Sequence, residues 1–482
     1  MSRLSWFLVL LIPLFGDPPW QPNIRVSVET PWDTLNQGES CFAIWGDSIY
    51  SICNTAERSS VPIAPFAYSF DGGSSFDQKP FTDTLVGIIW HTDPVIEMDD
   101  SGHIHMLIQF SVRRLNHYFS RNGGQTWSDT SLVTGDYGVD KPWMVVNRNE
   151  IYIAWQQISG QTGIMFAKST DYGRTFTKTR IWNRTGITAL CMDESENLHL
   201  GLVAWNDRVY YRKSTDKGAS WSAEKYLADY WYQSGYGDRA PINSITAHGD
   251  IVFMTWVDNS RIYQDWDIKG IRSTDSGNTW SSPFIINDSL DGGQCKGWAT
   301  FDPYGGLHVI YYHCPFWPTS STTPFSLRYQ YSPDSGITFN PSVRVSDTCA
   351  PSHADFMGEY HIVRTDSLYV YAIWTCGRNP QDNDLYFSKA LISQVKVGEG
   401  MDYQPGSEPI SIPTIWHGPV MIKSNLKINR LSIYDCSGRI VRTISKGENE
   451  IRLDSRLLPP GVFFLRIETS ENTLTSKVVN LR

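Results

Sequence analysis

The 482-residue sequence has no excess of basic residues, since 41 Lys and Arg stand against 50 Asp and Glu for a formal net charge of −9. Nucleic acids and anionic membranes are bound through a concentrated basic footprint, so neither is expected as the main partner. After the N-terminus, no apolar run approaches the ~20 residues that a membrane-spanning helix needs. The eight cysteines are widely and irregularly spaced, which gives no metal motif and no compact disulfide framework. Cys41 and Cys53 flank one predicted strand junction, where they could form a disulfide or remain buried free thiols.

The first 16 residues have the pattern of a secretory signal peptide. One arginine is followed by a largely apolar stretch with a proline near its end, in M-S-R-L-S-W-F-L-V-L-L-I-P-L-F-G. This stretch has the length of a signal-peptide core and is too short to span a bilayer. The alternative is a buried strand or helix of the mature fold. We expect an exported protein that is cleaved near Gly16.

A short phrase of the form Ser-x-Asp-x-Gly-x-Thr/Ser-aromatic occurs six times, beginning at positions 69, 120, 169, 214, 273 and 332. A phrase that recurs at such intervals indicates a repeat architecture. An acidic residue two positions before glycine is turn chemistry, because its side chain accepts backbone N–H groups and glycine adopts positive φ. We therefore assign a structural role to the residues at the acidic position, which are Asp71, Asn122, Asp171, Asp216, Asp275 and Asp334.

Alternating apolar strands precede each phrase, and four such strands make a unit of roughly 50 residues. The chain holds seven of these units, although the last stops at 384–389, where a seventh phrase would begin. Residues 22–28 (P-N-I-R-V-S-V) closely resemble 341–347 (P-S-V-R-V-S-D), the outer strand of the sixth unit. Pairing of this N-terminal strand with the last unit would close a ring and remove an open sheet edge. The sequence predicts an all-β fold, a seven-bladed β-propeller with six blades as the alternative, followed by a small C-terminal β-sandwich.

The six phrases resemble the Asp box of the sialidase propellers, known also as bacterial-neuraminidase repeats, over roughly residues 25–395. The resemblance implies a propeller and raises the possibility of an exo-sialidase. Members of that family clamp the substrate carboxylate with three arginines and use a tyrosine nucleophile activated by a glutamate, with an aspartate as acid/base. The family's Arg-Ile-Pro phrase is absent here, since Arg25 lies in I-R-V and belongs to the proposed closing strand. The chain more closely resembles uncharacterised exported repeat proteins that carry D-K-P-W, as at 140–143.

The functional face of such a propeller is formed by the loops that enter the inner strands and those that join the second and third strands. Acids, arginines and aromatics that meet there are suited to sugars. The recurring Asp before Pro either lines this funnel or caps its own turn. Arg239 and Arg378 are the candidate clamp residues, and Glu359 with Tyr360 is the candidate activated pair, although neighbouring strand residues point to opposite faces. Catalytic candidates at the funnel are Asp93, Asp140, Asp238, Arg239, Asp355, Glu359 and Arg378, and candidates for ligand binding are Lys141, Trp143, Trp298 and His353.

A separate C-terminal module follows the predicted propeller of residues 22–395 and a predicted linker at 396–412. Residues 413–482 contain alternating strands joined by glycine turns, typical of a small β-sandwich. The phrases I-Y-D-C-S-G-R-I-V and P-P-G-V-F-F-L-R resemble the C-terminal sorting domain of the type IX secretion system. This resemblance implies that the secretion machinery is a partner and that the propeller is released or held at the cell surface. The alternative is a generic carbohydrate-associated sandwich.

Two hypotheses for function follow. In the first, a secreted or surface propeller recognises a glycan or glycoprotein and hydrolyses it if the sialidase residues meet. In the second, a non-catalytic adhesion or scaffold propeller is displayed through the sorting domain. We expect a monomer without a cofactor. Q-D-N-D at 381–384 offers oxygen atoms for Ca²⁺ but lacks the full loop that such sites use.

Overall fold

The structure is a computed structural model, and its chain separates into two units, Met1–Gly398 and Glu399–Arg482. The predicted signal peptide and most of the predicted linker lie outside the described residues. No helix in the described part of the chain has the length and apolar character needed to cross a membrane. The structure describes residues 19–28, 36–55, 64–81, 91–110, 113–135, 138–235, 240–259, 265–290, 292–318, 320–353, 357–379, 381–395, 410–411, 415–416, 419–435, 439–445, 447–469 and 473–480.

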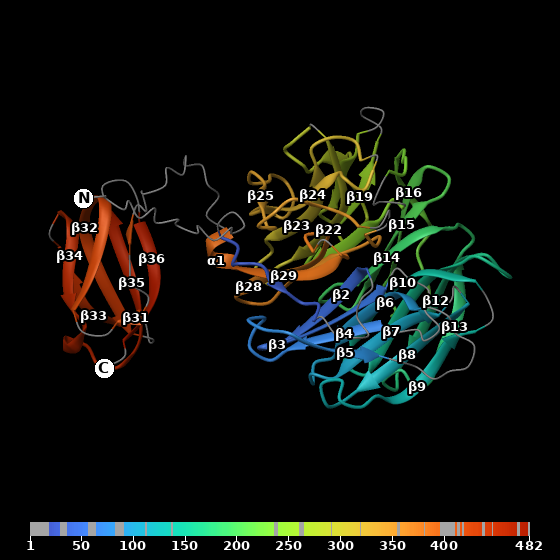
Figure 1. The fold of residues 1–482 in the computed structure, drawn as a ribbon, viewed down its shortest axis with the longest axis horizontal. Helices are drawn as coiled ribbons and strands as arrows, with labels where there is room; N and C mark the ends of the chain where they lie inside the picture. The colour runs from blue at the N-terminus through green and yellow to red at the C-terminus, as the bar shows by residue number, and fades with distance from the viewer. Residues whose placement is uncertain are drawn as a thin grey trace, which may run out of the picture. The chain divides into compact units, whose positions relative to one another are not determined.

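The first unit consists of antiparallel sheets that follow one another along the chain, and we number them 1 to 7 (Figure 1). Sheets 1 to 3 contain, from the inner strand outward, β2 (Gln37–Trp45), β3 (Ser48–Thr55), β4 (Ala64–Ser69) and β5 (Asp77–Phe81); β6 (His91–Met98), β7 (Ile104–Phe110), β8 (Arg114–Ser120) and β9 (Ser128–Thr134); and β10 (Val139–Asn147), β11 (Glu150–Gln157), β12 (Gly163–Ser169) and β13 (Thr177–Trp182).

Sheets 4 to 7 continue this order, with one additional short strand in sheet 6. They contain β14 (Gly186–Met192), β15 (Leu198–Ala204), β16 (Arg208–Ser214) and β17 (Lys225–Asp229); β18 (Asn243–His248), β19 (Ile251–Asp258), β20 (Asp267–Ser273) and β21 (Phe284–Ile285); β22 (Gly293–Phe301), β23 (Leu307–Cys314), β24 (Pro324–Ser332), β25 (Val343–Arg344) and β26 (Ala350–Pro351); and β27 (Ile362–Thr365), β28 (Tyr369–Cys376), β29 (Asp384–Leu391) and β1 (Ile24–Arg25).

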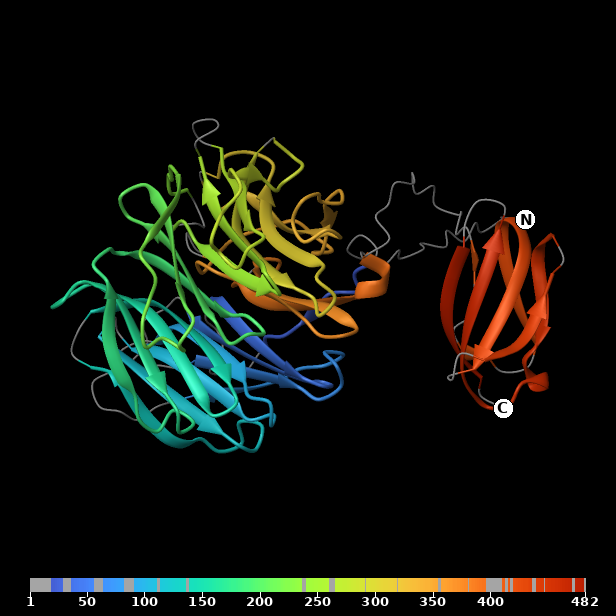
Figure 2. The same cartoon turned by 180° about the vertical axis from the view of Figure 1, so that it is seen from behind.

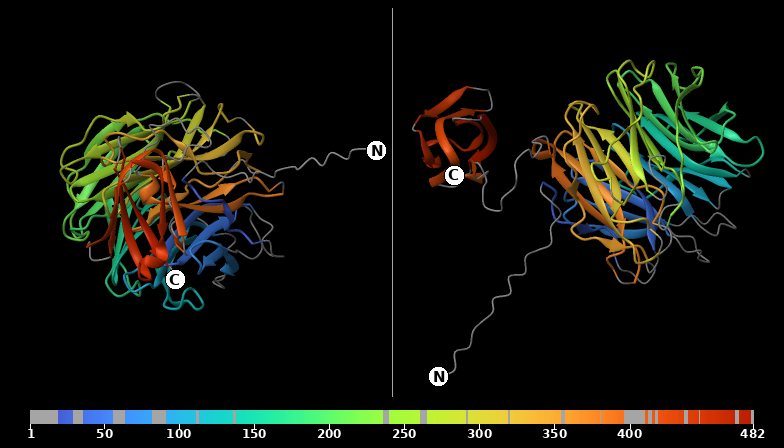
Figure 3. Two further views of the ribbon diagram at one scale, coloured as in Figure 1. Left: turned by 90° about the vertical axis from the view of Figure 1, so that its left-hand side faces the viewer. Right: turned by 90° about the horizontal axis from the view of Figure 1, so that it is seen from above.

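The inner strands close into a ring, because each contacts the next from β2 round to β27 and β27 contacts β2 again. Figure 3 shows the first sheet, in blue, beside the last, in orange. The N-terminal strand β1 pairs with β29 in register, Ile24 opposite Phe387 and Arg25 opposite Tyr386. The prediction that this strand completes the last sheet is confirmed. After β29 the chain forms α1 (Ile392–Val395), a single short helical turn.

The second strands of the sheets are buried on both faces. Every residue of β7 and of β15 is buried, because each sheet packs between two neighbours in the ring. Buried histidines on these strands have polar partners: His199 Nε2 lies 3.1 Å from Asp193 Oδ2, and its Nδ1 lies 2.7 Å from the Tyr211 hydroxyl. His308 has the same contacts with Asp302 and Tyr329. These contacts satisfy polar groups that burial would otherwise leave unpaired.

The six repeated phrases form turns between the third and fourth strands, and their hydrogen bonds are alike. In the fourth copy, Asp216 Oδ1 accepts from the Ser220 amide at 2.8 Å, and Ser214 Oγ accepts from the Gly218 amide at 2.8 Å. The other five turns have the same two contacts. Gly218 has a φ of 84°, and a Cβ there would lie 2.2 Å from the Phe166 ring of the preceding sheet. The phrase therefore also sets how closely neighbouring sheets approach.

The seven cysteines that the structure describes are free thiols. Cys41 and Cys53 are both buried and form no disulfide, so the second of the two alternatives for this pair is the one observed. The Cys41 thiol lies 3.6 Å from the carbonyl oxygen of Ile96 in the neighbouring sheet. Both side chains therefore act as small apolar groups in the core.

The second unit is a small β domain with its own core (Figure 2). Its strands are antiparallel except for β31, which pairs parallel with β36. Near its C-terminal end, the amide nitrogen of the buried Asn480 lies within 3.1 Å of the carbonyl oxygens of Ser455, Leu458 and Pro459. Its elements are β30 (Ile410–Ser411), β31 (Ile415–Trp416), β32 (Pro419–Asp435), β33 (Ile440–Ile444), β34 (Glu448–Asp454), η1 (Ser455–Leu457), β35 (Gly461–Thr469) and β36 (Thr473–Asn480).

Candidate functional site

Four inner strands carry a β-bulge at the same place, close to where each strand begins. The pairing register shifts between Gly38 and Cys41 in β2, Thr92 and Val95 in β6, Asp140 and Trp143 in β10, and Cys295 and Trp298 in β22. A bulge re-aims the side chain it carries and recurs next to functional sites. Each bulge holds one charged residue at positive φ, and these are Glu39 (52°), Asp93 (47°), Lys141 (50°) and Lys296 (55°).

The bulges of sheets 1 to 3 bring their charged side chains together around the Lys141 ammonium group. Lys141 Nζ lies 2.9 Å from Asp93 Oδ1 and 3.4 Å from Asp140 Oδ1, and it also pairs with Glu359 from the loop before β27. Glu39 Oε2 accepts from the Asp93 amide at 3.2 Å and from the Asn54 side chain. We call Glu39, Asp93, Asp140, Lys141 and Glu359 the channel cluster. It joins sheets 1, 2 and 3 to the loop that enters sheet 7.

The acids of the channel cluster differ in how readily they ionise. Burial, reinforced by the carboxylates of Asp93 and Glu359, raises the pKa of Glu39 well above its usual range. Burial also raises the pKa of Asp93 to about 7, against the opposing effect of Lys141. For Glu359 burial acts in the same upward direction, but the Lys141 ammonium group and a hydrogen bond with Glu39 lower its pKa to about 2. The pKa values of Glu39 and Glu359 are thus shifted in opposite directions, a separation typical of acid and base in one site.

Three residues of the channel cluster have partly exposed side chains that a ligand can reach. Glu39 and Asp93 are each only 1% exposed, whereas the side chains of Lys141, Glu359 and Asp140 are 11%, 12% and 27% exposed. The carboxyl and ammonium groups of these three residues can hold hydroxyl groups, as polar groups in sugar sites do.

Two tryptophans follow the bulges along their strands and meet inside the ring. The rings of Trp143, from sheet 3, and Trp298, from sheet 6, have centroids 4.6 Å apart, and both side chains are partly exposed. Tyr360 packs against both, with its centroid 6.0 Å from that of Trp143. Its hydroxyl donates to the carbonyl oxygen of Pro94 at 3.1 Å. Burial raises the pKa of Tyr360 well above its usual range. Tyr360 is thus a packing residue in this structure, and its hydroxyl is directed to the backbone.

A metal is another occupant to consider, because oxygen atoms of Glu39, Asp93 and Glu359 all lie within 4.8 Å of one another. The Lys141 ammonium group already contacts two of these three carboxylates and supplies the positive charge. At 381–384, two of the side-chain oxygens have protein partners: Asp384 Oδ1 pairs with Arg25 Nη2 at 2.7 Å, and Asn383 Oδ1 accepts from the His353 amide at 2.9 Å. The predicted calcium position stays an untested expectation.

Six of the predicted site residues meet in or beside the channel cluster. Asp93, Asp140, Lys141 and Glu359 meet in the channel cluster, and Trp143 and Trp298 meet beside it. Asp93 precedes Pro94, is buried, and pairs with Lys141 of the neighbouring inner strand. Asp238, Arg239 and Asp355 lie outside the described residues.

Two predicted residues lie away from the cluster. Arg378 pairs with Asp347, donates to Asn23 Oδ1 at 3.1 Å and lies 3.8 Å from the centroid of the Tyr386 ring. Its guanidinium group therefore ties the last sheet to the segment after β25. His353 Nε2 lies 2.8 Å from the Gly377 carbonyl oxygen and holds a loop to the same sheet.

Sequence reasoning missed Glu39 and Lys296. Glu39 is in N-Q-G-E-S-C, at the start of the first inner strand, and Lys296 is in G-Q-C-K-G-W. The signal that relates them to Asp93-Pro94 and Lys141-Pro142 is a charged residue followed by Pro, Gly or Ser at the start of an inner strand. Lys296 Nζ donates to the Gly358 carbonyl oxygen, directly before Glu359, and so helps to position the loop that carries this acid.

Solved structures to which the chain is similar include the following distant likenesses. An α-L-arabinofuranosidase from Fusarium graminearum is 11% identical, with 78% of this chain and 98% of that chain covered and a TM-score of 0.45. The NanB sialidase from Streptococcus pneumoniae is 12% identical, with 77% and 71% covered and a TM-score of 0.42. PorZ, a surface component of the type IX secretion system of Porphyromonas gingivalis, is 12% identical, with 95% and 61% covered and a TM-score of 0.39. No curated protein sequence matches the chain.

The C-terminal unit does match a family. Residues 416–480 match the secretion system C-terminal sorting domain, and this range contains the strands β32 to β36 and the core of the second unit. The matched range includes the two phrases on which the sequence resemblance rested. The C-terminal unit is a type IX sorting domain, which indicates that the chain is exported to the cell surface or released.

Proposed function

We propose that this exported propeller binds glycans at the channel cluster and does not act as an exo-sialidase. The observation that carries the proposal is the convergence of Asp140, Lys141 and Glu359, all partly exposed, beside the partly exposed rings of Trp143 and Trp298. Sugars are recognised by a few polar groups beside aromatic surfaces, a combination that this part of the channel offers.

Two contacts speak against sialidase chemistry in the described part of the chain. A sialidase needs arginines around the substrate carboxylate, but the cation in the channel cluster is Lys141, and Arg378 is engaged by Asp347 elsewhere. The family's nucleophile would be a tyrosine activated by a glutamate, whereas the Tyr360 hydroxyl donates to the Pro94 carbonyl oxygen. An anionic sugar would also meet the carboxylates of Asp140 and Glu359, which repel it. A neutral glycan fits this charge distribution better.

The test measures glycan binding and sialoside hydrolysis on the same full-chain protein. We expect neutral glycans to bind in an array, and Glu359→Gln and Asp140→Asn to weaken this binding. Asp229→Asn is the matched control, because the Asp229 side chain lies on β17 and is 75% exposed. A fluorogenic sialoside should not be cleaved. Turnover of that sialoside that is lost in Arg378→Ala or Arg239→Ala would overturn the proposal.

Hydrolysis of another glycosidic bond is the second candidate, and one observation favours it. The pKa of Glu39 is raised and that of the adjacent Glu359 is lowered, and acid and base of hydrolytic sites are separated in the same sense. Glu39 is only 1% exposed, however, so its proton would have to pass through Glu359 to reach a substrate. Release of reducing ends from neutral oligosaccharides, lost in both Glu39→Gln and Glu359→Gln, would support hydrolysis. Binding without release would support the first candidate.

A further inference from the structure

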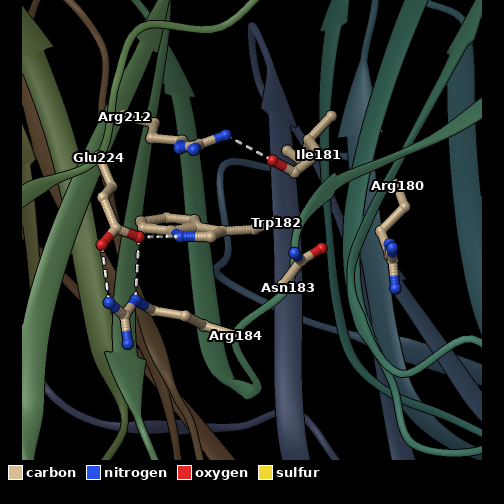
Figure 4. A pocket seen from close by; sticks show the side chains of 7 residues that line it. All are labelled: Arg180, Ile181, Trp182, Asn183, Arg184, Arg212 and Glu224. Carbon is tan, nitrogen blue, oxygen red and sulfur yellow. Dashed lines mark hydrogen bonds and ion pairs between the residues drawn. The ribbon is translucent and has the colours of Figure 1, made fainter.

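A cavity of about 550 Å³ lies away from the channel cluster, between the outer strand of sheet 3 and the outer part of sheet 4 (Figure 4). A volume of this size is within the range of small-molecule sites. The cavity is lined by Arg180, Ile181, Trp182, Asn183, Arg184, Arg212 and Glu224.

The lining is strongly basic in a protein that is acidic overall. Its lining contains three arginines and one glutamate, and the glutamate carboxylate already has partners. Glu224 accepts two hydrogen bonds from Arg184, at 2.9 and 2.6 Å, and a third from Trp182 Nε1 at 2.8 Å (Figure 4). The charges of Arg184 and Glu224 offset each other, and those of Arg180 and Arg212 remain.

Neither remaining arginine has a carboxylate partner among the described residues. Arg212 lies 4.9 Å from the centroid of the Trp182 ring and donates through Nη1 to the Ile181 carbonyl oxygen. Its Nε is buried and has no protein partner. Burial, with the nearby Arg184 charge, lowers the pKa of the Arg212 guanidinium and outweighs the opposite effect of the Glu224 carboxylate. Arg180 makes a single long contact, 3.4 Å from Nη1 to the Thr162 carbonyl oxygen.

We propose that this cavity is a second ligand site that binds the carboxylate or sulfate group of an anionic saccharide. Guanidinium groups present paired donors that match the two oxygens of such groups, so two arginines without an ion-pair partner in one cavity favour an oxyanion. The Trp182 ring is covered by Arg212, so charge rather than ring stacking governs recognition. The exposed amide of Asn183 can bond to sugar hydroxyls. The saccharide part of this assignment rests on the proposed function, whereas the oxyanion part rests on the arginines alone.

The test is calorimetric titration of the full chain with a sulfated disaccharide, a uronic-acid disaccharide and the matching neutral disaccharide. We expect at least one anionic ligand to bind, and Arg180→Ala to weaken it about tenfold by removing a charge-assisted hydrogen bond. Arg180→Ala combined with Arg212→Gln should abolish binding. Lys178→Ala is the matched control, since Lys178 is exposed on the same strand, carries the same charge and does not line the cavity. Arg180 is itself exposed, so its removal should leave the fold unchanged.

Each outcome decides one part of the proposal. Binding of the sulfated but not the uronic disaccharide, or the reverse, identifies the oxyanion. Equal binding of the neutral disaccharide, or an equal loss in Lys178→Ala, overturns the site. Tighter binding of a glutamate-rich peptide than of either disaccharide overturns the saccharide assignment. Anionic binding that persists in Glu359→Gln, while neutral glycans fail to bind the wild type, would refute the proposed function and leave this site standing.

Discussion

Lys141 Nζ lies 2.9 Å from Asp93 Oδ1, and this contact joins the inner strands of sheets 2 and 3 at the channel. Both residues occupy bulges at positive φ, a conformation that bulky residues seldom adopt. The same lysine also pairs with Glu359 from the loop that enters sheet 7. One ammonium group thus compensates acids from distant parts of the chain, and several expectations depend on it.

Replacing Lys141 with methionine should destabilise the propeller at neutral pH. The buried carboxyl group of Asp93 and the partly exposed ones of Glu359 and Asp140 would lose their counter-charge, and breaking a buried pair typically costs about 3–5 kcal/mol. The loss should be smaller at pH 5, where the carboxyl group of Asp93, with its pKa near 7, is protonated. Urea unfolding at pH 8 and pH 5 measures both values. Lys178→Met, at an exposed lysine of β13, is the control and should change stability little at either pH.

Asp93 should make stability fall as the pH rises from about 4 to about 7. Its pKa in the folded protein is about 7, above the ordinary 3.8, so over this range the folded state binds more protons than the unfolded state. Stability decreases with pH wherever that is so. Thermal unfolding between pH 4 and 8 tests the slope, and Asp93→Asn should flatten it. An unchanged slope in the variant would assign it to another group, with Glu39 the nearest candidate.

Acid should lower the stability of the fold through the aspartates of the repeated turns, the opposite of its effect through Asp93. Hydrogen bonds from Ser75 lower the pKa of Asp71 to about 2, and Ser220 and Thr279 do the same for Asp216 and Asp275. These groups stabilise the fold above their unfolded pKa near 4, and that contribution is lost as the pH falls to about 2. Chemical denaturation from pH 5 to 2 should show this loss. The double variant Asp216→Asn, Asp275→Asn should show a shallower slope, because asparagine does not titrate, as at Asn122.

Gly218→Ala should destabilise the contact between sheets 3 and 4. The position has a φ of 84°, and an added Cβ would lie 2.2 Å from the Phe166 ring. Gly249→Ala is the matched control, since its φ is 55° but no atom lies within 4 Å of the added Cβ. The control should lose about 1–2 kcal/mol from backbone strain alone, and Gly218→Ala about 1–3 kcal/mol more from the clash. Equal losses in urea unfolding would show that the ring contact does not matter.

Removal of residues 399–482 should retain the propeller inside the cell, because the sorting domain lies entirely in the second unit. The measurement is the distribution of full-length and shortened chains between cell fractions and medium, in a host with type IX secretion. A carrier protein fused to residues 399–482 is the reciprocal control and should be exported. Export of the shortened chain would contradict the role of this unit.

The sequence by itself determined the repeated turns, the strands between them and the sorting domain. Asp216 accepts from Ser220 and Ser214 from Gly218, all within positions 214–220, so turn chemistry predicts these contacts without knowledge of the rest of the fold. The resemblance of 22–28 to an outer strand likewise predicted that this strand pairs with the last sheet, where the structure places Ile24 opposite Phe387.

Only the tertiary structure decided how the channel is arranged. Glu39 and Glu359 are about 320 positions apart and meet because the ring closes, while local bulges at Glu39 and Asp93 rotate those side chains toward Lys141. Arg378, a candidate clamp residue, pairs with Asp347 instead. Tyr360, a candidate member of the activated pair, donates its hydroxyl to the Pro94 carbonyl oxygen. The pattern of a strand predicts which face is apolar, but the direction of a bulged side chain depends on the register between strands and on the charges that the closed ring brings beside it.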